Sequence, residues 1–127
     1  MKYLISVTLL SLPLLGCDFP DPEQIRENQF LPDKNFKPNI RIGEAKYNSS
    51  CSQCHGKSAR GSSIGPPLVH KLYLPNHHAD QSFRWAVRDG VKQHHWHFGD
   101  MPKMKDITPE DIANIILYVR TEQRNAN

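Results

Sequence analysis

Apolar side chains follow their clearest period near the end of the 127-residue chain. They recur at intervals of three and four residues, at Ile112, Ile115, Ile116 and Val119. This spacing is typical of one face of a helix that packs on a core. Thr108 is a good N-cap, and Pro109 suits the first helical position. The pattern therefore predicts a long amphipathic helix that starts at Thr108 and has a polar, frayed end from Arg120 onward.

A shorter helix is predicted from Asp80 to Gly90. Its apolar face has the spacing i, i+3, i+4, at Phe83, Ala86 and Val87. Either Asp80 or Ser82 can cap the start, and Gly90 is placed to end the helix. Residues 42–50 give a looser helical match, in which Ile42, Ala45 and Tyr47 can share a face.

The first 16 residues have a different pattern. Lys2 supplies one positive charge, an apolar run follows, and Gly16 is a small residue at its end. This order is typical of an export signal, and the run is too short for a confident membrane span. Leu14-Leu15-Gly16-Cys17 resembles a bacterial lipoprotein signal, so we expect cleavage before Cys17 and lipidation of its thiol. Asp18 resembles an inner-membrane retention signal.

Residues 17–40 are polar and rich in proline, with no sustained apolar period. Proline disfavours helix at the residue before it, so this segment is interpreted as a tether after the lipidated cysteine. A chain of this length would reach roughly 25 to 30 Å from a bilayer. The alternative is that the segment wraps around the domain, with Ile25 and Phe30 as anchors.

Composition fits one small domain. The formal charge of +3 is weak, and removal of Lys2 leaves 15 basic against 13 acidic residues. Nucleic-acid binding usually needs a concentrated basic face, so it is not expected. The balance also gives no clear docking face.

The chemistry of the chain centres on Cys51-Ser52-Gln53-Cys54-His55. Two thiols at this spacing can each form a thioether to a haem vinyl group, and the histidine that follows can ligate the iron. Half of a structural zinc site is the alternative, but it would need a second ligand pair. The remaining cysteine, Cys17, is explained by lipidation. We therefore predict one covalent haem c.

These features resemble the small monohaem cytochromes c of bacteria, the class that includes mitochondrial cytochrome c. The resemblance covers about residues 40–124. It implies an all-α fold of three to five helices around the haem, in a domain from 41 to 127 that follows the signal peptide (1–16) and the tether (17–40). It also implies that Gly43 and Tyr47 lie where the first helix crosses the last, and that Tyr118 meets that first helix.

The same resemblance implies the remaining haem contacts. Gly65-Pro66-Pro67-Leu68 is similar to the segment on the proximal side of the haem, where the Pro66 carbonyl would orient His55. Met101-Pro102 is similar to the axial methionine and the proline that follows it. Met104 is the competing ligand. A histidine could replace both methionines, since His94, His95 and His97 lie nearby in the sequence, but this would depart from the family pattern. Methionine ligation would give a comparatively high potential.

Six further histidines fall within residues 70–97. Imidazole is a good ligand for copper, nickel and zinc, so two histidine clusters could form a second metal site beside the haem. The best candidates are His77, His78, His94 and His95, with His70 next. Polar loops that use histidines as caps or leave them solvated are the alternative. The segments around these histidines resemble a histidine-rich subgroup of exported cytochromes c.

Two functions follow. The first is a lipid-anchored electron carrier on the periplasmic face of a bacterial membrane, most simply the inner membrane, with redox proteins of the periplasm or membrane as partners. It would carry single electrons and would not be an enzyme. The alternative is a haem protein whose His-ligated copper site acts in copper-linked redox chemistry, sensing or delivery.

Overall fold

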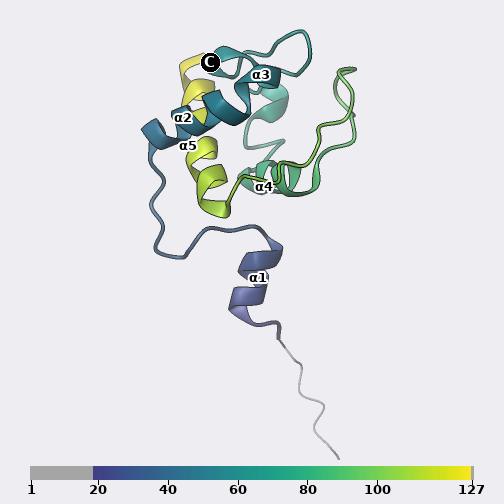
Figure 1. Ribbon diagram of the computed structural model, residues 1–127. Helices are drawn as coiled ribbons and strands as arrows, with labels where there is room; N and C mark the ends of the chain where they lie inside the picture. Colours follow the sequence, from purple (N-terminus) through teal and green to yellow (C-terminus); the bar gives the residue numbers. More distant parts are fainter. Residues whose placement is uncertain (1–18, 127) are drawn as a thin grey trace, which may run out of the picture.

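The computed structural model describes residues 19–126, and this part of the chain is helical (Figure 1). Its α-helices are α1 (Pro22–Asn28), α2 (Ile40–Ser50), α3 (Ser52–His55), α4 (Asp80–Asp89) and α5 (Pro109–Ala126). Short 3-10 turns occupy Lys57–Ala59 and Lys71–Tyr73. Within the described residues the β structure is an isolated antiparallel bridge between Val91 and Met101. The all-α prediction is confirmed.

The crossing of α2 and α5 forms the centre of the core. A Cβ atom on Gly43 would lie 2.0 Å from the Asn114 carbonyl oxygen, so only glycine allows the two backbones to approach this closely. One turn later, the rings of Tyr47 and Tyr118 pack with centroids 5.2 Å apart. The predicted contacts of Gly43, Tyr47 and Tyr118 are therefore confirmed.

The buried face of α2 differs from the predicted one. Gly43 and Tyr47 are buried, whereas Ala45 is exposed and Ile42 keeps 49% of its surface exposed. The close approach of the two helices at Gly43 explains this difference. Gly43 and Tyr47 are four residues apart and share one face of α2, so this face packs on α5 and the face with Ile42 and Ala45 does not.

Helix α5 starts as predicted. The Thr108 hydroxyl accepts a hydrogen bond from the Asp111 amide at 3.1 Å, and Pro109 is the first helical residue. The prediction of a frayed end was wrong, because α5 continues to Ala126. Arg120 and Gln123 are buried, with 8% and 2% of their surfaces exposed.

Helix α4 ends as predicted but starts differently. Gly90 terminates it with a φ of 80°. The N-cap is Ala79, which has no capping side chain, so neither Asp80 nor Ser82 has the expected role. The Ser82 hydroxyl donates instead to the Ala79 carbonyl at 2.6 Å, and the Asp80 carboxylate pairs with Arg120. A tertiary ion pair thus replaces the local cap.

Part of the segment predicted as a tether is helical and contacts the domain. Asp21 caps α1 by accepting from the Glu23 amide at 3.1 Å. The Gln81 side-chain amide donates to the Gln29 carbonyl at 2.7 Å, and Phe30 packs against the core. In Figure 1, α1 lies below the body formed by the other helices. These contacts favour the surface-wrapping alternative from α1 onward.

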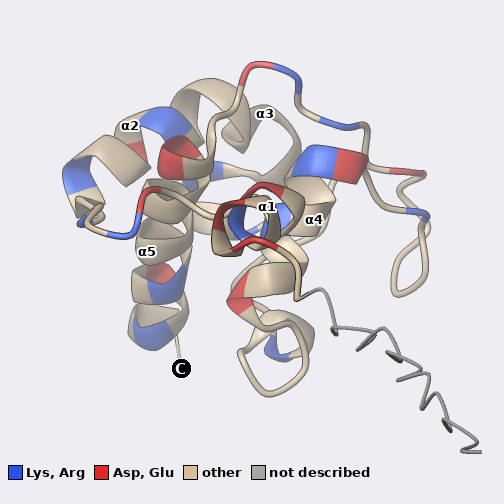
Figure 2. Ribbon diagram, turned by 90° about the horizontal axis from the view of Figure 1, so that it is seen from below, with Lys and Arg blue, Asp and Glu red and all other residues tan. Residues whose placement is uncertain are grey.

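The predicted signal peptide, residues 1–16, and Cys17 lie outside the described residues. Among residues 19–126, no helix has the length and apolar character needed to cross a membrane. Figure 2 shows basic and acidic segments interspersed along α2, α4 and α5.

Candidate functional site

A cavity of about 330 Å³ opens between the core helices and the loop that follows α4. Its walls are mostly apolar. They come from all three larger helices and include Tyr47, Phe83, Val87, Ile112, Ile115 and Val119. The predicted haem ligands His55 and Met101 also line it, together with Cys51. The cavity therefore brings together Cys51, His55 and Met101 from distant parts of the sequence.

Helix α3 positions His55. Its Nδ1 lies 3.0 Å from the Pro66 carbonyl oxygen, so Nδ1 carries the proton and donates it, which leaves the Nε2 lone pair free. Burial lowers the pKa of His55, although the Pro66 bond opposes this effect. The ring is therefore neutral at pH 7, as a metal ligand must be.

Of the two cysteines of the motif, Cys51 is the N-cap of α3 and Cys54 lies within this helix. Neither forms a disulfide within the described residues. Burial, and then the neighbouring Cys54, raises the pKa of the Cys51 thiol to about 11, while Cys54 is exposed. The turn after His55 requires Gly56, because a Cβ atom there would lie 1.9 Å from the Gly61 carbonyl oxygen. The Tyr47 hydroxyl donates to the Gly56 carbonyl at 2.8 Å and holds this turn on α2.

Met101 is fixed through its backbone. Its amide and carbonyl each form a 2.9 Å hydrogen bond with Val91. Gly90 makes room for this bridge, because a Cβ atom there would lie 2.7 Å from the Met101 carbonyl oxygen. Both Met101 and Met104 pack against the core, but Met101 lines the cavity and Met104 is not part of its lining. The geometry favours Met101 as the ligand, and its ligand role stays a prediction.

The cavity fits a covalently attached haem. Its apolar walls suit a porphyrin, the Cys51 thiol and His55 line it, and Met101 supplies a thioether from another segment. Cys54, three residues after Cys51, is exposed and is not part of the lining. In addition, the Trp96 indole Nε1 is buried at the cavity, beside the Tyr73 side chain, without a hydrogen bond of normal length and angle in the described residues. A buried N–H of this kind usually has an acceptor, and a haem propionate is one.

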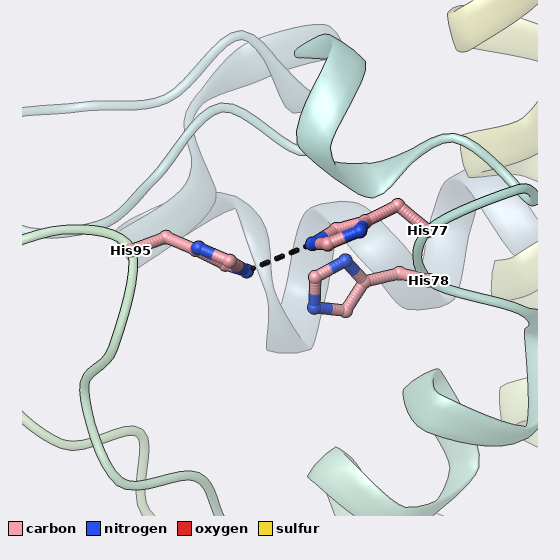
Figure 3. Close-up of side chains that lie close together, drawn as sticks. All are labelled: His77, His78 and His95. Atoms are coloured by element: carbon pink, nitrogen blue, oxygen red, sulfur yellow. Dashed lines mark hydrogen bonds between the residues drawn. The ribbon is translucent and has the colours of Figure 1, made fainter.

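Three of the predicted metal-binding histidines converge. One ring nitrogen from each of His77, His78 and His95 lies within 4.8 Å of the others. The Nε2 atoms of His77 and His95 are 3.3 Å apart and form a hydrogen bond (Figure 3). Figure 3 also shows that His95 comes from one loop and the adjacent pair from another.

The other candidates lie outside this group of three. The His94 ring packs on His95 with centroids 4.3 Å apart, and its Nδ1 donates to the Lys92 carbonyl at 2.8 Å. His70 Nδ1 accepts from the Leu72 amide at 3.3 Å, and its ring packs edge-on against Trp96. His70 therefore serves as a cap, as the alternative interpretation of these histidines allowed.

The pKa values of two of the converging rings, His78 and His95, are lowered. The pKa of His78 is lowered, chiefly by burial and further by the charges of His77, His94 and Arg120, although its bond to Leu72 opposes this effect. The pKa of His95 is lowered by desolvation and then by its three histidine neighbours.

Sequence reasoning missed Arg120. Its guanidinium donates to the Tyr73 and His78 carbonyls, both at 2.6 Å. These bonds hold the loop that carries His77 and His78, here called the histidine loop, against α5. A signal was present, because Arg120 follows Ile116 by four residues and Gln123 follows Val119 by four. Both polar residues therefore continue the buried stripe of the helix.

Comparison with known families gives one match over most of the chain. Residues 38–119 match the family described as cytochrome c oxidase, cbb3-type, subunit III. This range contains the cysteine motif, Met101 and all of the histidines.

Two relatives with assigned functions are similar in sequence. The cbb3-type cytochrome c oxidase subunit CcoP of Rubrivivax gelatinosus is 35% identical over 82 residues, which cover 63% of this chain and 25% of that protein. Cytochrome c-L of Methylorubrum extorquens is 29% identical over 96 residues, which cover 74% of this chain and 44% of that protein. The chain thus spans less than half the length of either relative.

A solved structure has a similar fold. The crystal structure of cytochrome cL from Methylophaga aminisulfidivorans aligns with a TM-score of 0.52 and 24% identity, over 84% of this chain and 70% of that one.

Proposed function

The chain belongs to the cytochrome c oxidase, cbb3-type, subunit III family of c-type cytochromes, and from this premise we propose that it carries single electrons through one covalent haem with histidine and methionine ligands. The observation that supports this most directly is that Cys51, His55 and Met101 line the same apolar cavity although they come from separate segments. A bound haem would supply reversible one-electron chemistry.

Four side chains would hold the haem. Cys51 and Cys54 would form the thioethers, His55 would ligate through Nε2, and Met101 would ligate through sulfur. Pro66 would keep the imidazole in one orientation and raise its basicity, since its carbonyl accepts the Nδ1 proton. Trp96 would donate its indole N–H to a propionate.

We further propose that the protein is exported and anchored at the periplasmic face of the inner membrane through lipidated Cys17. Its partners would be redox proteins of the periplasm or the membrane, and the chain itself would not catalyse a reaction. The relatives support redox proteins as partners, because one is a subunit of an oxidase and the other is a cytochrome. The attachment motif occurs once in the sequence, so one haem is expected.

The test is a redox titration of the purified haem-bearing protein. We expect a reversible one-electron change, haem that resists acid-acetone extraction, and ferrous protein that does not bind carbon monoxide because both axial positions are occupied. Extractable haem would exclude thioether attachment. Rapid carbon monoxide binding would exclude methionine ligation and favour a sensor or an enzyme.

A second candidate function is copper-linked redox chemistry, copper sensing or copper delivery. The convergence of His77, His78 and His95 beside the haem cavity supports it. The chain would then bind copper as well as haem, and the haem would serve as the electron outlet.

A further inference from the structure

We propose that His77, His78 and His95 form a three-imidazole site for a divalent first-row transition metal, with copper bound most tightly. The site deepens the second candidate function, and it does not depend on which redox partner the haem serves. It joins the loop before α4 to the loop after α4.

The spacing of two ligand atoms already fits a metal. Two ligands at 2.0 to 2.1 Å from a tetrahedral ion lie roughly 3.3 to 3.4 Å apart. The Nε2 atoms of His77 and His95 are 3.3 Å apart. In the metal-free chain one of these nitrogens donates its proton to the other. A metal would take the place of that hydrogen bond once the donor ring moves its single ring proton from Nε2 to Nδ1, so that both Nε2 lone pairs are free.

The third ligand is oriented by the backbone. His78 Nδ1 donates to the carbonyl of Leu72. This bond leaves Nε2 as the free lone pair, and metal-binding histidines are commonly held in this way by a carbonyl on their other nitrogen. His78 is also half-buried, with its ring against Tyr73 at a centroid distance of 5.0 Å. Leu72 is therefore a positioning residue for the site.

The charges around the site permit a cation. Arg120 donates to the His78 carbonyl, and its charge contributes to the lowered pKa of His78. Its charge is offset by Asp80, whose carboxylate oxygen lies 2.8 Å from Arg120 Nε. A site of three imidazole ligands binds copper more tightly than nickel or zinc, in the usual order of affinities.

The site has an open side. His77 is exposed, and only three histidines converge within ligand distance in the described residues. His94 lies next to His95 with its Nδ1 bound to a carbonyl, so its Nε2 is a further imidazole nitrogen with a free lone pair beside the group of three. An ion with three protein ligands keeps a position for water or an incoming ligand, which suits exchange of the metal.

The experiment uses the full haem-bearing protein with copper(II) chloride as the probe. After incubation and dialysis against glycine, the copper-to-iron ratio is measured by elemental mass spectrometry. We expect about one copper per haem iron, and we expect this ratio to depend on His77. The electron paramagnetic resonance spectrum of the bound copper should show hyperfine splitting from nitrogen ligands. Nickel(II) and zinc(II) chloride should be displaced by an equal concentration of copper.

His77→Ala is the decisive variant, because His77 is exposed and does not line the haem cavity. We expect copper retention to fall at least tenfold. His97→Ala is the matched control, since His97 is an exposed histidine on the same loop as His95 and lies outside the group of three. A ratio near zero in the native protein, or a ratio that His77→Ala leaves unchanged, would overturn the proposal. The redox titration of the same samples tests the electron-carrier function separately.

Discussion

The Arg120 guanidinium donates a hydrogen bond from Nη2 to the backbone carbonyl of His78 at 2.6 Å. The same side chain also binds the Tyr73 carbonyl, pairs with Asp80 and packs over the Phe83 ring, 4.7 Å from its centroid. One buried residue on α5 thus fixes both the histidine loop and the start of α4. The position of the proposed metal ligands depends on the last helix.

Arg120→Ala should therefore destabilise the protein and weaken metal binding together. The change leaves the His78 carbonyl without its donor, removes one of the two donors to the Tyr73 carbonyl and breaks the ion pair with Asp80. We expect the free energy of unfolding to fall by about 2 to 4 kcal/mol. Denaturant unfolding of the haem-bearing protein measures this. Arg124→Ala is the control, because Arg124 is exposed and bonds only within α5, to Thr121. Equal effects of the two substitutions would contradict the anchoring role.

Gly43→Ala should separate α2 from α5. The new Cβ atom would overlap a backbone oxygen, at 2.0 Å, and backbone cannot rotate away as a side chain can. We expect a loss of about 3 kcal/mol in the free energy of unfolding. Ala45→Ser on the exposed side of α2 should change it by less than about 0.5 kcal/mol. A Gly43→Ala protein as stable as this control would show that the crossing is looser than described.

Met101→Ala should lower the haem midpoint potential and open an axial position. Loss of the thioether removes a ligand that favours the ferrous state. The measurements are the redox titration and carbon monoxide binding by the ferrous protein, which we expect only in this variant. Met104→Leu is the control, because Met104 packs in the core without lining the cavity. Carbon monoxide binding in Met104→Leu but not in Met101→Ala would reassign the ligand.

Copper bound at the proposed site should be released by acid. The lowered pKa values of His78 and His95 mean that both rings are neutral at pH 7, so metal binding displaces no proton from them there. As the pH falls below roughly 6, protons compete for the nitrogens and copper retention should decline steeply. Dialysis at a series of pH values measures the copper-to-iron ratio. Retention that stays constant down to pH 4 would indicate ligands other than imidazole.

Copper binding should also raise the haem midpoint potential. His78 and His95 line the cavity that would hold the haem, so a divalent ion bound to them adds positive charge near it. Positive charge disfavours the ferric state, which carries one more charge than the ferrous state. Redox titration with and without copper measures the shift, and His77→Ala should abolish it. An equal shift in His77→Ala would place the copper elsewhere.

Local sequence signals predicted a large part of this protein. The cap at Thr108, the period of α5 and the glycine after α4 are set by residues within a few positions of one another, so they could be read directly. The attachment motif and the Gly43–Tyr47 pair were likewise recognisable, because each depends on a fixed short spacing.

Tertiary structure decided which polar residues act together. The sequence offered five metal-binding histidines, and the fold brings three of them together across 18 residues of sequence, while His70 caps a turn. The fold also buries Arg120 against the His78 carbonyl, 42 residues away in the sequence. It pairs Asp80 with Arg120, so Asp80 does not cap α4 as expected. Caps and helix periods depend on neighbours along the chain. The set of metal ligands and the partly buried ion pair depend on how the loops are held against a helix that is distant in the sequence. No local sequence pattern encodes these contacts.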